Sequence, residues 1–220
     1  MDFGRRRVLE LFAGAPLLAG LGLSSAAAET AHGHTARAVK AAAGGHAYKP
    51  RFFTVREWEM VRVLVDLIIP RDERSGSATD AGVPEFMDFI MTDPMEDDRG
   101  REQRQTAMHG GLAWIDAEST GRFGHAFVEA SDAERRSLLD DIAYVEVEED
   151  EEEDRGSEAR DLRVKLGQGK AFFSSFRDLT AAGFWSSRMG VEDLAYQGNT
   201  AVTEWTGCPP EALRKLGLEP

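Results

Sequence analysis

The chain has 220 residues and a formal net charge of −13, which arises from 39 Asp and Glu residues against 26 Lys and Arg residues. A protein this acidic repels phosphate backbones and anionic lipid head groups, which excludes nucleic-acid binding as its function. The length suffices for one domain with an apolar core, and the single cysteine, Cys208, excludes an intrachain disulfide.

The first 28 residues have the layout of an export signal. Arg5, Arg6 and Arg7 form a positive head, residues 11–23 are apolar, and a run of alanines ends at Ala28. The paired arginines followed by apolar residues match the twin-arginine type of signal. The apolar segment rises ~1.5 Å per residue as a helix and is too short for a hydrocarbon core of ~30 Å. We therefore predict a twin-arginine signal peptide cleaved after Ala28, with an ordinary secretory signal and an uncleaved anchor as the alternatives.

The segment behind the signal, residues 29–50, is small and polar without periodicity, so we expect a flexible leader there. A helical domain is predicted over residues 51–220. Its first helix is expected behind Thr54, because Thr54 and Glu57 have the spacing of a capping box. Apolar residues then recur at helical spacing until Pro70 ends the helix.

Further helical segments follow in chain order. Pro84 opens a short apolar helix, and the next helical stretch covers residues 101–117. Ser131 and Glu134 form a second capping box, and an aromatic helix ends near Trp185. No alternating run of β-branched residues is present. The predicted fold class is therefore all-α, as a single irregular helical domain with a partly non-regular C-terminal tail.

Two segments lack helical periodicity. Residues 146–154 (EVEEDEEED) place eight carboxylates in nine positions, and such a run repels itself and stays solvated. We therefore expect a disordered acidic insert over residues 146–156. Calcium binding is the alternative, although the oxygen spacing and turn glycine of a calcium loop are missing. The tail from Gly190 to Pro220 is expected to be irregular, apart from a short helix over residues 210–216.

The sequence lacks the motifs by which many enzymes are recognised. It has no glycine-rich dinucleotide fingerprint behind a strand, no phosphate-binding loop, no Glu-x-x-His pair and no haem-attachment or iron–sulfur motif. We predict no catalytic, cofactor-binding or metal-binding residue in this chain. His32 and His34 offer only two ligands for a metal ion, and Cys208 is either a buried thiol or a covalent link to a partner.

A series of short motifs follows the order and spacing of a known family. They are FFT with EW at residues 52–58, DLIIPRD at 66–72, AGVPEF at 81–86, FF with LT at 172–180, GFWS at 183–186, YQGN at 196–199 and WTGCP at 205–209. Together they resemble the gluconate 2-dehydrogenase subunit 3 family over residues 50–215, with the acidic insert as a departure from the family pattern.

The resemblance implies a role in a complex. Members of this family are small, signal-bearing subunits that pair with a large flavin-dependent oxidoreductase of the glucose-methanol-choline type. A membrane-bound cytochrome c often accepts the electrons. The chain is then expected to be the non-catalytic small subunit and export escort of a sugar or sugar-acid dehydrogenase. FAD is expected in the partner subunit and no cofactor in this chain, and the complex is expected in the periplasm, associated with the membrane.

The candidate partner interface consists of Trp185, Tyr196, Asn199 and Trp205, because aromatic side chains are enriched where interfaces gain their binding energy. Two alternatives stay open: the aromatic rings pack the tail onto its own helices, or they line the pocket of a free-standing periplasmic small-molecule-binding helical protein. An unrecognised hydrolase is a third hypothesis. A neighbouring gene for a large flavin oxidoreductase without its own signal would favour the escort role.

Overall fold

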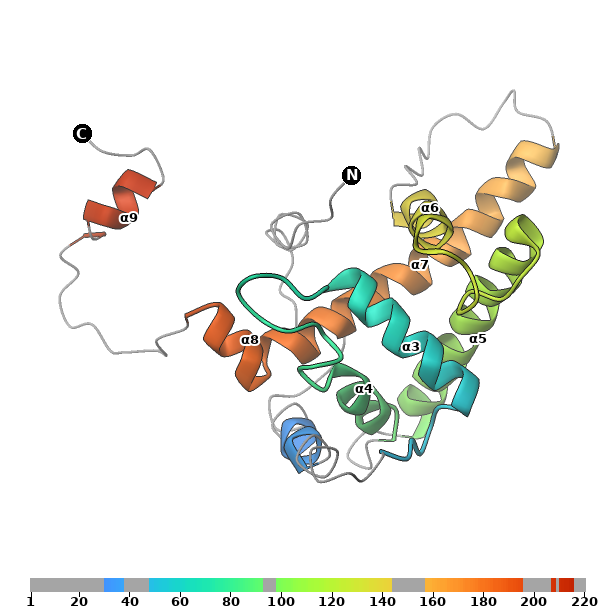
Figure 1. The fold of residues 1–220 in the computed structure, drawn as a ribbon. Coiled ribbons are helices and arrows are strands. Elements are labelled where there is room, and N and C mark those ends of the chain that lie inside the picture. Colours follow the sequence, from blue (N-terminus) through green and yellow to red (C-terminus); the bar gives the residue numbers. More distant parts are fainter. Residues whose placement is uncertain are drawn as a thin grey trace.

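The protein is described by a computed structural model that covers residues 30–37, 48–92, 98–143, 157–195, 207–208 and 210–215. Within these ranges the chain is helical and contains no strand, which confirms the all-α prediction. The labelled helices in Figure 1 are α3 (Val55–Ile68), α4 (Val83–Met91), α5 (Asp98–Phe123), α6 (Asp132–Ala143), α7 (Ser157–Trp185), α8 (Arg188–Asp193) and α9 (Pro210–Lys215). A further helix covers residues 30–37.

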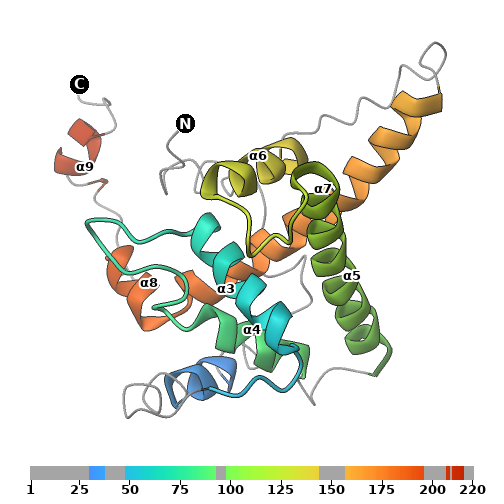
Figure 2. The ribbon, with the colours of Figure 1, turned by 45° about the vertical axis from the view of Figure 1, so that its right-hand side comes forward.

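The long helix α7 is the centre of the fold. It contacts α3, α4, α5, α6 and α8, and Figures 1 and 2 show it crossing the bundle, with α8 at its C-terminal end. Its buried face carries large aromatic and aliphatic side chains, which belong to the same core as the apolar faces of α3 and α4. The core members on α7 are Phe173, Phe176, Leu179 and Phe184.

Local sequence signals place several helix ends. Thr54 and Glu57 form the predicted capping box of α3, in which each side chain bonds to the other residue's backbone N–H. Ser131 and Glu134 form the second box at the start of α6. Helix α5 extends further at both ends than the predicted range of residues 101–117, and it stops before Gly124. Gly124 has a φ of 84°, the left-handed conformation that commonly ends a helix.

The tail begins differently from the prediction. Residues 188–193 form helix α8 instead of irregular chain, because the Ser187 side chain accepts a hydrogen bond from the Gly190 N–H and caps the helix. The short terminal helix is present as α9, which ends at Lys215. The acidic insert and the segment around Tyr196 and Trp205 lie outside the described residues.

Part of the segment expected to be a flexible leader is helical. In the helix over residues 30–37, Ala31 is fully buried, and two histidine rings stack on phenylalanines of α4. His32 lies 5.1 Å from Phe86 and His34 lies 4.4 Å from Phe89, measured between ring centroids. These contacts join rings that are distant in the sequence, so composition alone did not predict the helix over residues 30–37.

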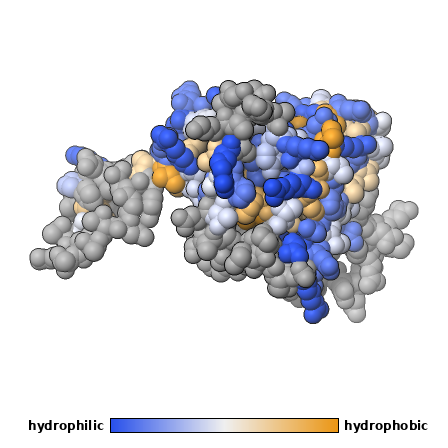
Figure 3. All heavy atoms as spheres, turned by 90° about the horizontal axis from the view of Figure 1, so that it is seen from below, coloured by the Kyte–Doolittle hydropathy of each residue, from blue (hydrophilic) through white to orange (hydrophobic). Residues whose placement is uncertain are grey.

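Few large hydrophobic side chains are exposed among the described residues. Val55 and Leu194 are two of them. On the face seen in Figure 3, hydrophilic residues cover much of the surface, and hydrophobic residues lie between them in small groups. None of the described helices combines the length and the apolar character that crossing a bilayer requires.

Candidate functional site

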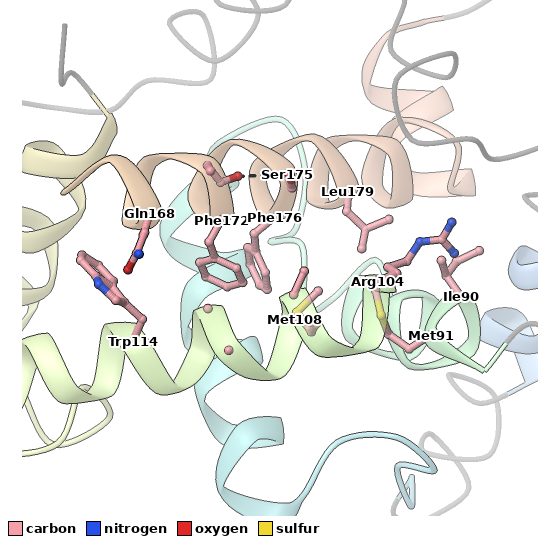
Figure 4. Close-up of a pocket in the computed structure, with 14 residues that line it drawn as sticks. Ile90, Met91, Arg104, Met108, Trp114, Gln168, Phe172, Ser175, Phe176 and Leu179 are labelled. Atoms are coloured by element: carbon pink, nitrogen blue, oxygen red, sulfur yellow. Dashed lines mark hydrogen bonds between the residues drawn. The ribbon is translucent and has the colours of Figure 1, made fainter. Parts of the chain in front are cut away.

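A groove with a cavity volume of about 690 Å³ lies between α5 and α7. Figure 4 shows that the two helices run antiparallel along it, with Trp114 and Gln168 at one end and Arg104 and Leu179 at the other. Most of its lining is apolar. The lining residues are Ile90, Met91, Arg104, Ala107, Met108, Gly110, Gly111, Trp114, Gln168, Ala171, Phe172, Ser175, Phe176 and Leu179.

Two glycines bring the walls of the groove together. The Phe172 ring of α7 lies directly over Gly111 of α5, where an added Cβ would come within 1.8 Å of the ring. In the opposite direction, the Trp114 ring of α5 lies over Gly169 of α7, where an added Cβ would come within 2.4 Å. Each ring therefore occupies the space that a side chain on the facing helix would need, and this reciprocal contact orients Phe172 and Trp114.

The polar groups of the groove lie mainly at its ends. The indole N–H of Trp114 is buried and donates to no acceptor, and the amide of Gln168 lies at the same end (Figure 4). Ser175 on the wall uses its hydroxyl within its own helix, donating to the carbonyl of Ala171. A buried N–H without an acceptor lowers stability by about 1–3 kcal/mol.

A second polar cluster surrounds the carboxylate of Asp88 on α4. Asp88 is fully buried and accepts hydrogen bonds from the backbone N–H groups of Arg51, Phe52 and Phe53. The Tyr48 hydroxyl donates a further bond at 2.8 Å. Burial and the bond to Asp88 raise the pKa of Tyr48 above its ordinary value, so the hydroxyl stays protonated. The carboxylate thereby holds the segment 48–53 against α4.

Beside Asp88 lies a smaller polar pocket of about 190 Å³. Its lining includes His34, Tyr48, Lys49 and Glu85. Burial raises the pKa of the Glu85 carboxyl, and one of its oxygens has no hydrogen-bond donor. Burial also lowers the pKa of His34, with the charges of Arg37 and Arg51 as lesser causes. Its volume is below the ~300–1,000 Å³ that is typical of small-molecule sites.

Of the predicted site residues, Trp185 is the one that the structure describes. It is half-buried at the end of α7, contacts the core, and lies edge-on to Phe184 at 4.9 Å between ring centroids. Its indole N–H is buried without an acceptor. Arg5, Arg6, Tyr196, Asn199 and Trp205 lie outside the described residues, so their roles stay predictions.

The sequence argument did not nominate the groove residues. It predicts an aromatic helix that contains Phe172 and Phe176, and it makes no prediction for the paired glycines Gly110 and Gly111. A glycine pair inside a polar helix indicates that another element approaches the helix closely. This pair was the signal in the sequence that could have indicated the groove. Within the described residues, no group of three or more His, Cys, Asp and Glu side chains is arranged to hold a metal ion.

The sequence matches the family described as "Gluconate 2-dehydrogenase subunit 3" over residues 55–203. The match starts with α3, runs past α8, and includes both walls of the groove. No curated protein and no solved structure matches the chain.

Proposed function

Because the chain belongs to the gluconate 2-dehydrogenase subunit 3 family, we propose that it is the non-catalytic small subunit and export escort of a flavin-dependent dehydrogenase complex. The family is named for one subunit of a dehydrogenase, so its members are components of a multi-subunit complex. This family membership is the observation that carries the proposal. The partner is a large oxidoreductase subunit of the glucose-methanol-choline type, which binds FAD and oxidises a sugar or a sugar acid.

The export part of the proposal rests on the N-terminal sequence. Arg5 and Arg6 precede a short apolar segment that is diluted by glycine and proline, a pattern typical of signals read by the twin-arginine machinery. This machinery transports folded proteins, so a flavin subunit bound to the small subunit travels with it. The complex then works in the periplasm, and a membrane-bound cytochrome c accepts its electrons.

Replacing Arg5 and Arg6 with Lys tests the escort role. We expect the small subunit and the flavin activity of its partner to stay together in the cytoplasm, because the receptor no longer recognises the paired arginines. Fractionation followed by immunodetection and an activity assay measures this. Arg136→Lys, an exposed change on α6, is the control and leaves export unchanged. Periplasmic flavin activity at the normal level, even after Arg7 is also changed to Lys, would contradict the escort role.

A second test asks which of the two subunits binds the flavin and carries the dehydrogenase activity. We expect the chain purified alone to show no flavin absorbance and no dehydrogenase activity, since its sequence lacks a dinucleotide-binding fingerprint. Co-expression with the large subunit should yield a complex with one flavin and with activity. The absorbance spectrum of each preparation, scaled to protein concentration, is the measurement. Stoichiometric flavin in the isolated chain would overturn the assignment.

A further inference from the structure

Two histidine rings pack the helix over residues 30–37 against the rest of the protein. His32 stacks on Phe86 with an interplanar angle of 23°, and His34 stacks on Phe89 with an angle of 24°. Both phenylalanines belong to α4, and Figures 1 and 2 show the helix, drawn in blue, beside α4. Histidine changes its charge near neutral pH, so both of these ring contacts join α4 to a group that can titrate.

A hydrogen bond adds to the contacts of His32. Its Nε2 atom lies 2.5 Å from Oγ of Ser186, the residue directly after α7. The Ser186 hydroxyl has one proton, which it donates to the carbonyl of Ala182. The imidazole N–H is therefore the donor to Ser186, and the second ring nitrogen, Nδ1, is the atom that can take up a further proton. The helix over residues 30–37 thus contacts both α4 and the C-terminal end of α7.

The buried residues of this helix are small. Ala31 is 0% exposed and Thr35 is 5% exposed. The Thr35 hydroxyl donates to the Ala31 carbonyl within the same helix, so it forms no bond to α4 in this way. Burying a few methyl groups contributes about 0.8 kcal/mol for each carbon. The rings of His32 and His34 are therefore a large part of what holds the helix in place.

Both rings favour the neutral form while the helix is docked. Burial lowers the pKa of His32 from its ordinary value of 6.5. Burial also lowers the pKa of His34, and the charges of Arg37 and Arg51 lower it further. The docked histidines therefore bind protons less readily than free ones. Docking is then favoured above pH 6.5 and becomes weaker as the pH falls below this value.

Neighbouring charged groups do not reverse this direction. The charged residues that line a pocket with His34 are Lys49, Arg51, Glu85 and Asp88. Burial raises the pKa of Glu85, which reduces its negative charge in mild acid, and the Asp88 carboxylate accepts hydrogen bonds from residues 48–53. Behind Ser186, the guanidinium of Arg188 pairs with Glu192 of its own helix.

We propose that the helix over residues 30–37 is a pH-dependent switch, docked on α4 and the end of α7 while His32 and His34 are neutral and released when they are protonated. Release uncovers one side of the two phenylalanine rings of α4 and the Ser186 hydroxyl. Mild acid therefore exposes aromatic surface that the helix covers at neutral pH. The switch consists of contacts within this chain, so it does not depend on the identity of a partner subunit.

Hydrogen–deuterium exchange of the purified protein at pH ~7.5 and ~5.5 tests the switch, with each rate divided by the intrinsic rate of an unstructured peptide at that pH. We expect the protection of residues 30–37 to fall at least ~fivefold at the lower pH. The reason is that each histidine favours the released state by up to ~tenfold at one pH unit below its ordinary pKa. Peptides from α6 should keep their protection within about twofold.

The decisive variant combines His32→Phe with His34→Phe. Its rings can still stack on α4 but cannot be protonated, so the helix should be equally protected at both pH values. His125→Phe is the matched control, because His125 also stacks near a phenylalanine ring, that of Phe123, but lies outside the helix over residues 30–37. This control should respond to pH as the wild type does.

The other outcomes would overturn the proposal. A wild-type helix that is unprotected at neutral pH, or equally protected at both pH values, is not a pH-dependent switch. If the double variant loses protection in acid as the wild type does, a group other than His32 and His34 titrates. If the double variant is unprotected at neutral pH, stacking of neutral rings does not hold the helix.

Discussion

Replacing Asp88 with alanine is expected to lower the free energy of unfolding by about 3–5 kcal/mol. The carboxylate is fully buried, and its removal leaves the Tyr48 hydroxyl and the backbone N–H groups of residues 51–53 without their acceptor. Each buried unsatisfied donor costs about 1–3 kcal/mol, and water reaching the more exposed of these groups reduces the sum. Urea unfolding of the purified subunit, monitored by tryptophan fluorescence, gives the value.

Two milder variants are expected to lower the free energy of unfolding by smaller amounts. Tyr48→Phe removes one hydrogen bond to Asp88 and should cost about 1 kcal/mol. Asp88→Asn keeps the volume and one acceptor oxygen but places an NH₂ group near the N–H of Arg51, so its cost should lie between those of the other two variants. If Asp88→Ala costs no more than Tyr48→Phe, the carboxylate does not hold the segment 48–53, and the assignment of a structural role to this cluster is wrong.

The second large effect is expected at the crossing of α5 and α7. Gly111→Ala places a Cβ 1.8 Å from the Phe172 ring, so the ring or the helix must move. Such overpacking costs about 1–3 kcal/mol or more, which exceeds the ~1 kcal/mol that alanine gains over glycine in a helix. We expect a net loss of about 2 kcal/mol in the free energy of unfolding, measured by urea unfolding.

The adjacent glycine is the control for this prediction. Gly110→Ala has the same helix propensity gain but meets no atom within 4 Å, so it should leave the protein equally stable or stabilise it by up to ~1 kcal/mol. A double-mutant cycle with Phe172→Ala adds a second check, because Gly111→Ala should become harmless once the ring is removed. Equal stabilities of the two alanine variants would show that α5 and α7 do not approach each other at Gly111.

Features that depend on neighbours in the chain were predictable from the sequence. The capping boxes of Thr54 with Glu57 and of Ser131 with Glu134 join residues three positions apart, so their spacing alone predicts two helix starts. The helical spacing of apolar residues in α3 and α4 and the absence of alternating β-branched runs predicted an all-α fold. The order of the short motifs predicted the family, which the match over residues 55–203 confirmed.

Helix limits were less predictable where the signal was weak. Most residues of α5 are polar and its apolar side chains are few, so periodicity indicated the middle of the helix and missed its ends. Gly124 was the stop signal, but a glycine indicates a helix end only when its φ is known. Likewise, Ser187 caps α8 only because the chain turns directly after α7, and a serine alone does not predict that turn.

The sequence by itself thus determined the fold class, the family and the starts of two helices, since these depend on local spacing and on motif order. Only the tertiary structure revealed the groove, because its walls come from segments about sixty residues apart. The contact between Gly111 and the Phe172 ring produces no periodic pattern in the sequence. The same holds for Asp88 and the segment 48–53, which are joined by hydrogen bonds across more than thirty residues. A buried carboxylate and an exposed one look alike in a sequence, and packing decides between them.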